Sequence, residues 1–325
     1  MTRPIVGLTH DEEQIPRHFL ATDLARLEAV AEVRVLGRER AQILPQLAEV
    51  EVLLGSWGMP RIDSELLAAA PRLRAVTYAA GTVKGFVTPE SYARGVTITT
   101  AMHANAVPVA EVTVALITLA NKNWFFAQAE SKAGKRRQDI PHVGNFGTVV
   151  GLVGFGAIAK LVAARLTQMD LTVLVYDPYA KDLPPGCEPV ADLLDLARRS
   201  DVVSLHAPDI PATHGMCSAA FFQAMRDGAT FINTARGKLV DEAALIAELQ
   251  TGRITAHLDV THLEPPVAGS PFYTLPNVHL TPHLAGSSSG EIRRMGRLAI
   301  EECLAFLAGK PLRYQVTEDM LATMA

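Results

Sequence analysis

The 325-residue chain has few of the features that mark disulfide-stabilised or nucleic-acid-binding proteins. Its three cysteines, Cys187, Cys217 and Cys303, are odd in number, widely spaced and absent from any CxxC pair. This usage favours a reducing, cytoplasmic location over a disulfide framework. The formal charge of −4 and the pI of about 6.2 give no electrostatic reason to expect a nucleic acid or an anionic membrane as a partner.

Long hydrophobic runs are also missing. The first residues, MTRPIVGLTH, enter a strand-like run without a signal-peptide core, and we expect no apolar segment of membrane-spanning length. The most apolar helical stretch begins at Pro108 and continues over residues 109–120. A helix that is apolar on nearly all sides is normally buried between layers or subunits, so this stretch predicts a connection between domains and a candidate dimer contact.

What the chain does contain fits a buried α/β fold, with 49% hydrophobic and only 6% aromatic residues. Its length favours two domains. Five short apolar runs separated mostly by helix-like stretches predict a small parallel sheet near the N-terminus (residues 4–9, 32–36, 50–55, 73–78 and 95–99). No glycine fingerprint follows them, so this first domain should hold something other than a dinucleotide. Its loops at 56–58 and 79–81 are either substrate walls or tight turns.

A strand, a glycine turn, a helix, a second strand and an acid follow one another over residues 148–177, TVVGLVGFGAIAKLVAARLTQMDLTVLVYD. Gly154 permits the sharp turn, and Gly156 has no side chain to keep a pyrophosphate off the backbone. The amides of Ala157 and Ile158 begin the helix and would point at the phosphates. Asp177 would accept hydrogen bonds from the adenosine ribose and repel a 2′-phosphate, which favours NAD(H) over NADP.

Polar residues follow four later strands, and in a parallel sheet ligands collect outside these carboxyl ends. The four endings are His206-Ala207-Pro208, the NTARG segment 233–237, Asp259 followed by Glu264, and His283. Asp259 could equally be held in the core by backbone amides. His279 and His283 stand four apart in an extended segment, so a metal site is not expected.

The residue types at these endings suit hydride transfer to a 2-oxo acid. The planar fork of Arg236 matches a substrate carboxylate, although a surface ion pair is the alternative. His283 can supply the proton that the carbonyl oxygen must receive as it is reduced. Glu264 beside it would favour the protonated imidazole.

Five motifs together resemble the D-isomer-specific 2-hydroxyacid dehydrogenases, in the order of that family: VGLVGFGAIA, VVSLHAPDIPATHG, FINTARGKLVDEAAL, HLDVTHLEPP and LTPHLAG. The resemblance implies an α/β fold of two Rossmann-like or flavodoxin-like domains with parallel sheets and a cleft between them. The substrate domain would be discontinuous, at 1–104 plus about 287–325, and the NAD-binding domain would cover 105–286. A final helix starting at Ser288 with Glu291 in a capping box could return to the first domain.

The resemblance also implies the roles of individual residues. It makes Arg236 the ligand of the substrate carboxylate, His283 the acid/base and Glu264 its partner, and it implies an NAD(H) cofactor and a homodimer. Ala157, Ile158 and Asp177 would contact the pyrophosphate and ribose. The remaining expected contacts are His206, Pro208 and Thr213 around the adenosine half, Thr234, Ala235, Asp259 and Gly286 near the nicotinamide, and Ala80 and Gly81 on the substrate.

Two segments depart from the family pattern. Thr261 stands where the family commonly has phenylalanine before the glutamate, and the first-domain loop reads AAGTVKGFV, in which Lys84 replaces an acid. The acid/base residues are intact, so these departures concern the choice of 2-oxo acid rather than the reaction. Two other functions stay open: a nucleotide-sensing, corepressor-like interaction protein on the same fold, and a phosphite- or formate-oxidising relative, although the formate group has glutamine in place of Glu264.

Overall fold

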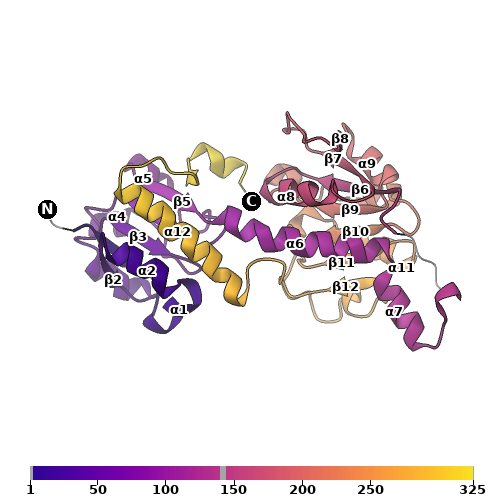
Figure 1. The fold of residues 1–325 in the computed structure, drawn as a ribbon, viewed down its shortest axis with the longest axis horizontal. Coiled ribbons are helices and arrows are strands. Elements are labelled where there is room, and N and C mark those ends of the chain that lie inside the picture. Colours follow the sequence, from indigo (N-terminus) through magenta and orange to yellow (C-terminus); the bar gives the residue numbers. More distant parts are fainter. Residues whose placement is uncertain (1–2, 140–143, 325) are drawn as a thin grey trace. The chain divides into compact units, whose positions relative to one another are not determined.

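The computed structural model describes residues 3–139 and 144–324, which divide into two compact units (Figure 1). Unit 1 consists of Met1–Asn105 and Ser287–Met324, and unit 2 of Ala106–Gly286. Each unit is built around its own sheet, and both sheets are almost entirely parallel. The predicted fold class, two α/β domains with parallel sheets, is confirmed.

The sheet of unit 1 has the strand order β13-β5-β4-β3-β1-β2, in which only the edge strand β13 runs antiparallel. Its strands are β1 (Ile5–Leu8), β2 (Glu32–Val35), β3 (Val52–Gly55), β4 (Ala75–Tyr78), β5 (Thr97–Thr100) and β13 (Gln315–Val316). Its helices are α1 (Ile15–His18), α2 (Ala21–Glu28), α3 (Arg40–Ile43), α4 (Ser64–Ala69), α5 (Pro89–Ala93) and α12 (Ile292–Leu307).

Helix α12 brings the C-terminal part of the chain back onto unit 1, as the sequence predicts. The side chains of Ser288 and Glu291 form the expected capping box, with the Ser288 amide donating to the Glu291 carboxylate at 3.2 Å. The buried face of α12 includes Met295, Ala299 and Cys303, and the helix packs on α1, α2 and β4 (Figure 1). The first hundred residues therefore share one core with residues nearly two hundred positions later.

The sheet of unit 2 has the order β12-β11-β10-β9-β6-β7-β8, and all its neighbouring strands are parallel. The strands are β6 (Thr148–Val153), β7 (Leu171–Tyr176), β8 (Cys187–Pro189), β9 (Val202–Leu205), β10 (Thr230–Asn233), β11 (Thr255–Leu258) and β12 (Val278–Leu280). Counted from β6, this is the Rossmann order 3-2-1-4-5-6 with one further strand. The order reverses between β6 and β9, where a dinucleotide normally binds.

The helices of unit 2 are α6 (Met102–Asn121), which begins in unit 1, α7 (Trp124–Lys132), α8 (Ala157–Leu166), α9 (Leu193–Arg199), α10 (Ala219–Ala224) and α11 (Glu242–Gln250). They cover both faces of this sheet, with α9, α10 and α11 in one core cluster and α6 and α8 in another (Figure 1).

Helix α6 corrects two expectations. It begins at Met102 rather than at Pro108, because the helix accommodates a proline that lacks only one backbone donor. With 20 residues, it is long and apolar enough to cross a membrane by length and composition, contrary to the prediction that no segment is. The same test is passed by a core helix, and Ala110 and Ile117 are fully buried against Val150 and Leu152 of β6. Of its most apolar window 39% is buried, so packing on the sheet accounts for only part of this composition.

A pair of stacked histidines lies on the sheet of unit 2. His257 and His279 occupy paired positions on β11 and β12, with ring centroids 4.5 Å apart, and the Phe125 ring of α7 lies 4.6 Å from that of His279. Burial, with repulsion from a protonated His279 as the smaller cause, lowers the pKa of His257 to about 3. Burial also lowers the pKa of His279, so the two rings pack as neutral groups.

His257 makes the stability of the fold depend on pH. Because the pKa of folded His257 lies below the ordinary value of 6.5, the unfolded chain takes up a proton first as the pH falls. The contribution of neutral His257 to the free energy of unfolding is fully present above pH 6.5. Below that pH it decreases by roughly 1.4 kcal/mol per pH unit. Replacing His257 by Phe should remove that contribution from the free energy of unfolding measured in urea between pH 7 and pH 5. An unchanged pH slope would contradict this account.

Candidate active site

Six neighbouring strands of unit 2 end at the same edge of the sheet, and almost every predicted site residue of this unit lies just beyond one of these ends. Gly154 follows β6, Asp177 follows β7 and His206 follows β9. Thr234 to Arg236 follow β10, Asp259 follows β11 and His283 lies three residues beyond β12. The strand order places the glycine turn and His206 on the two strands that flank the reversal.

The glycine turn can be built only without a side chain at its first glycine. Gly154 has φ +90°, and a Cβ atom there would lie 2.6 Å from the backbone nitrogen of Ala207. The turn is also tied to the next strand, since the Phe155 amide donates to Oδ2 of Asp177 at 2.6 Å. The loops after β6 and β9 are therefore in backbone contact at the switch point.

The start of α8 offers free donors. Among the described residues, none accepts a hydrogen bond from the amides of Gly156, Ala157 or Ile158, and no side chain caps the helix. A Cβ atom on Gly156 would meet open space. Free amides at a helix N-terminus beside open space form an anion site, so these residues fit the pyrophosphate of a dinucleotide.

Asp177 is fixed by two backbone donors. Its Oδ2 accepts from Phe155, and its Oδ1 accepts from the Tyr179 amide at 2.8 Å. Each carboxylate oxygen still has a lone pair for a ribose hydroxyl, and the half-buried side chain is reachable. The carboxylate is thus already oriented, and its charge disfavours a 2′-phosphate.

The loop after β9 holds the three residues expected around the adenosine half. The Thr213 hydroxyl donates to the Pro208 carbonyl at 2.5 Å and so closes this loop. His206 is buried, and burial lowers its pKa to about 4. Its Nε2 bonds to the Ser204 hydroxyl at 3.0 Å, while its Nδ1 has no hydrogen-bond partner among the described residues. A neutral imidazole therefore stands next to the glycine turn.

Arg236 is held by an asparagine whose role the sequence analysis missed. The Asn233 side chain accepts from the Ala235 amide at 3.0 Å and donates to the Arg236 carbonyl at 3.1 Å. An asparagine at a strand end followed by a turn is the sequence signal for such a bridge. The Arg236 guanidinium bonds only to the Ala235 carbonyl, at 2.6 Å, and pairs with no described carboxylate. Within residues 3–139 and 144–324, Arg236 forms no surface ion pair, the alternative to a carboxylate ligand.

Gly237 joins the arginine loop to the glutamate loop. A Cβ atom on Gly237 would lie 2.0 Å from the carbonyl carbon of Thr261 and 2.2 Å from the His262 amide nitrogen. The backbone of the loop after β10 therefore rests directly on the backbone of the loop after β11. This contact fixes the spacing between Arg236 and the segment that carries Glu264.

Asp259 shapes the histidine loop. Its carboxylate accepts from the Thr281 hydroxyl at 2.6 Å and from the amides of Leu284 and Ala285 at 2.7 and 2.9 Å. Its carbonyl accepts from the His283 amide at 2.9 Å. The structure thus agrees with the second interpretation of Asp259, a carboxylate held by backbone amides, and its expected contact with the nicotinamide stays a prediction.

His283 and Glu264 form the pair that the sequence suggests. His283 Nδ1 lies 2.7 Å from Glu264 Oε2, and the two side chains remain 48% and 39% exposed. Since Nδ1 is engaged, Nε2 is the nitrogen available to a ligand. His283 has φ +53°, a left-handed conformation that is rare for residues other than glycine. Such a conformation persists where the surrounding contacts impose it, here those of Asp259.

The remaining predicted cofactor residues, Thr234, Ala235 and Gly286, lie in the loops that follow β10 and β12. The Thr234 hydroxyl is buried and lies 3.1 Å from the Thr113 hydroxyl of α6. Ala235 is buried and accepts the Arg236 bond. Gly286 is half-buried at the end of the histidine loop. In residues 3–139 and 144–324, no group of three His, Cys, Asp or Glu residues could hold a metal ion.

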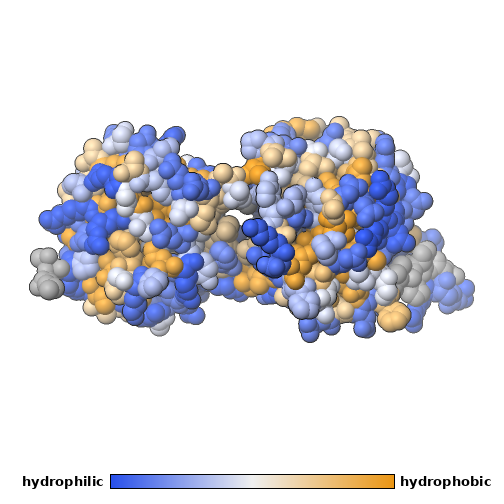
Figure 2. Space-filling model, turned by 90° about the horizontal axis from the view of Figure 1, so that it is seen from above, coloured by the Kyte–Doolittle hydropathy of each residue, from blue (hydrophilic) through white to orange (hydrophobic). Residues whose placement is uncertain are grey.

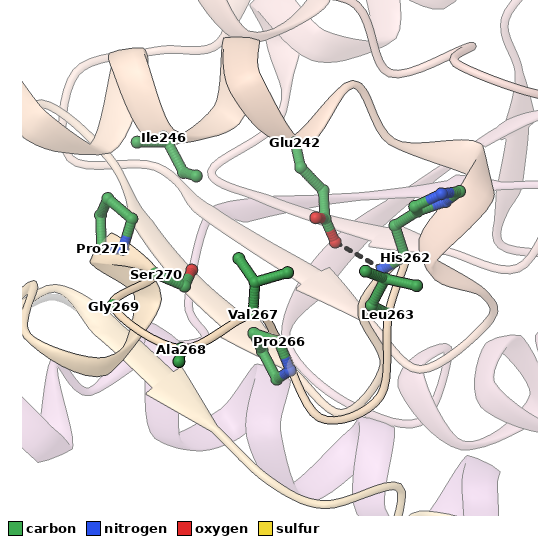
Figure 3. A pocket seen from close by; sticks show the side chains of 10 residues that line it. All are labelled: Glu242, Ile246, His262, Leu263, Pro266, Val267, Ala268, Gly269, Ser270 and Pro271. Carbon is green, nitrogen blue, oxygen red and sulfur yellow. Dashed lines mark hydrogen bonds between the residues drawn. The ribbon is translucent and has the colours of Figure 1, made fainter.

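One cavity of unit 2 lies apart from these residues. It has a volume of about 250 Å³ and lies between α11 and the segment from His262 to Pro271 (Figure 3). Its lining is mainly apolar, and the Glu242 carboxylate accepts from the His262 amide at its edge. Because it contains none of the predicted site residues, this cavity is not part of the candidate active site.

In unit 1, the loop after β4 presents Ala80 and Gly81. The Ala80 carbonyl accepts from the Thr100 hydroxyl at 3.1 Å and from the Ala101 amide at 3.0 Å. The amides of Ala80 and Gly81 donate to none of the described residues. Ala80 is fully buried and Gly81 is half-buried, so a ligand would reach this pair of amides at Gly81. Unpaired amides in a turn fit a carboxylate.

Comparison with known proteins places these features in a family. The D-isomer specific 2-hydroxyacid dehydrogenase NAD binding domain matches residues 114–285. D-3-phosphoglycerate dehydrogenase of Mycobacterium leprae is 34% identical over 307 residues, which cover 91% of this chain and 58% of that protein. Glyoxylate reductase of Thermofilum pendens is 33% identical over 274 residues, 80% of each chain. The chain spans little more than half the length of the phosphoglycerate dehydrogenases that it matches.

A solved structure is similar to this chain over both units. The apo form of D-mandelate dehydrogenase from Rhodotorula graminis superposes with a TM-score of 0.83 at 26% identity, covering 97% of this chain and 98% of that one. Residues 114–285, which contain the glycine turn, Asp177 and the His283–Glu264 pair, are therefore similar to an NAD-binding domain in both sequence and fold.

The two glycines of the turn should respond differently to alanine. Gly154→Ala introduces a strained φ and a backbone clash, and should lower the free energy of unfolding by roughly 2 kcal/mol or more. Gly156→Ala has an ordinary φ and open space, so it should keep the thermal midpoint while weakening NADH binding roughly tenfold, about 1.4 kcal/mol. Thermal melting and NADH fluorescence titration check both. Equal loss of stability in the two variants would contradict the assignment.

Proposed function

Because the chain belongs to the D-isomer specific 2-hydroxyacid dehydrogenase family, we propose that it interconverts a 2-oxo acid and the corresponding (R)-2-hydroxy acid with NAD(H). The observation that carries this proposal is the 2.7 Å bond between His283 and Glu264, in the same unit as an arginine that has no ion-pair partner among the described residues. NAD(H) supplies or takes up the hydride when it is bound.

Arg236 binds the substrate carboxylate in this scheme. Arg236 and His283 follow β10 and β12, with β11 between them, which separates their backbones by roughly 10 Å, two strand spacings. Both side chains are long enough to reach a small acid between them. A guanidinium bonded only to a carbonyl can exchange that bond for two charge-assisted bonds to a carboxylate.

The amides of Ala80 and Gly81 in unit 1 are proposed as donors to a substrate carboxylate. Their carbonyls are turned toward Thr100, which leaves the two N–H groups for a ligand. Backbone donors fixed in this way lose no side-chain freedom when the substrate binds.

His283 moves the proton. In reduction its Nε2–H donates to the carbonyl oxygen as negative charge develops there, and the neutral imidazole accepts the hydroxyl proton in oxidation. The Glu264 carboxylate accepts from Nδ1, fixes the ring orientation and stabilises the positive charge while the ring is protonated. A glutamine could accept the bond from Nδ1 and orient the ring, but it could not stabilise the positive charge. This difference separates the proposal from the formate-type alternative.

The proposal is tested by measuring NADH absorbance loss with a panel of 2-oxo acids: glyoxylate, pyruvate, hydroxypyruvate, phenylpyruvate and 2-oxoglutarate. We expect turnover of at least one and a loss of roughly 10²–10⁴-fold in kcat for His283→Ala, with NADH still bound. His262→Ala, an exposed histidine of the same loop region, should retain activity. NADH binding without turnover of any acid would favour the corepressor-like alternative. Reduction of NAD that depends on phosphite would favour the phosphite-oxidising alternative.

We also propose a homodimer formed through unit 2. Val112 of α6 and Trp124 and Phe126 of α7 are 37%, 55% and 47% exposed. Aromatic side chains of this size on adjoining helices favour contact with a second copy. On the face drawn in Figure 2, hydrophobic residues are interspersed with hydrophilic ones.

Sedimentation of the chain should give twice its mass of 35.0 kDa, and Trp124→Glu with Phe126→Glu should halve that value. A monomer at micromolar concentration would contradict the dimer.

A further inference from the structure

Lys84 is the least expected residue of the loop that carries the free amides. This loop, residues 79–86, is named the amide loop. Lys84 is exposed, and its side chain donates to the backbone carbonyl of Met324, 240 positions later in the chain. The ammonium group of Lys84 therefore binds another part of the same chain.

The segment that Lys84 reaches is firmly attached to unit 1. Residues 313–324, named the C-terminal strap, begin where the buried carboxylate of Glu302 accepts from the amides of Arg313 and Tyr314, both at 3.1 Å. The Tyr314 carbonyl then accepts from the Thr100 amide at 3.1 Å, and β13 pairs with β5. Glu302 is only 1% exposed, so the strap begins from a fixed point of α12.

The strap also enters the core beneath the amide loop. Met324 is 7% exposed and belongs to the same cluster as Val83 and Phe86, with Leu321 packed against it. The strap thus contacts the amide loop in two ways: through the side chain of Met324 from below and through its carbonyl to Lys84 at the surface.

The two ends of the amide loop are then held by two neighbouring elements. Thr100, the last residue of β5, bonds to the carbonyls of Ala80 and Gly81, and it is itself bonded to the strap through Tyr314. Lys84 ties the other end of the loop to the end of the strap. The amide loop is thus linked to residues 313–324 at Thr100 and at Lys84. It is also held by bonds from the Ala79 amide to Gly55, from the Ala101 amide to Ala80 and from the Ile62 amide to Phe86.

We propose that Lys84 is a positioning residue: by binding the C-terminal strap it holds the amide loop so that the Ala80 and Gly81 amides are preorganised for the substrate carboxylate. The inference rests on the proposed function. Amides that bind the carboxylate equally in the ground and transition states affect KM rather than kcat. A loop that must be ordered at binding costs affinity, which the strap contact avoids.

The test compares Lys84→Met, which removes the charge and keeps the length, with Lys84→Arg, which keeps a donor. Lys310→Met, another exposed lysine of unit 1, is the matched control. Lys84→Met should raise KM for the accepted 2-oxo acid roughly three- to tenfold and change kcat less than twofold, as expected for one charged hydrogen bond at a partly exposed site. NADH affinity should not change, and Lys84→Arg should restore most of the KM.

A second variant separates positioning from simple stability. Met324→Ala should raise KM in the same direction, and the double variant Lys84→Met/Met324→Ala should be less than additive, because both act through the strap. A lowered thermal midpoint with KM unchanged in Lys84→Met would overturn the proposal. So would a KM increase for 2-oxoglutarate without one for pyruvate, because Lys84 would then bind the second carboxylate of the substrate itself.

Hydrogen exchange keeps this test independent of the reaction. Lys84→Met should speed exchange of the amide loop and of residues 319–324 and leave α8 unchanged. If the wild-type chain reduces none of the acids yet shows this exchange pattern, the proposed function fails and the strap contact stands. If it reduces them and the pattern is absent, the positioning role of Lys84 fails.

Discussion

The hydrogen bonds of Asp259 are the constraint on which the candidate active site depends. This buried side chain accepts from Thr281, Leu284 and Ala285, and its carbonyl accepts from His283. The segment after β12 is consequently folded back toward the end of β11, and the imidazole is placed against Glu264. Burying a carboxylate costs free energy unless its oxygens are hydrogen-bonded, as both are in Asp259. These bonds impose the left-handed conformation of His283, which no local sequence preference would produce.

The same principle extends along the sheet edge. Asn233 holds Arg236, Asp177 holds the glycine turn, and Thr213 closes the loop after β9. In each case a polar side chain at a strand end or in the segment that follows a strand satisfies backbone groups of such a segment. The functional side chains are then carried by loops, yet these loops are nearly as well fixed as the strands.

Much of this could be predicted from the sequence because the signals are local. Short apolar runs mark the strands, a helical pattern marks α12, and glycine, acid and histidine at strand ends mark the ligand-binding edge. What could not be predicted depends on distant partners. The Thr234 hydroxyl is hydrogen-bonded to that of Thr113, 121 positions earlier, and the Lys84 side chain is hydrogen-bonded to the Met324 carbonyl. Helix α6 was predicted too short because a proline usually marks the first turn of a helix, whereas here it lies inside one.

Gly237 has a consequence for how such a protein can change. Because its backbone touches that of Thr261 and His262, the two loops that carry the arginine and the glutamate have no spare volume between them. Insertions or bulkier residues in one loop would have to be matched by the other, so the pair can diverge only together. Variation in the acid that is accepted is then more easily obtained in unit 1, where the loop after β4 has no such backbone contact at Gly81 or Gly85.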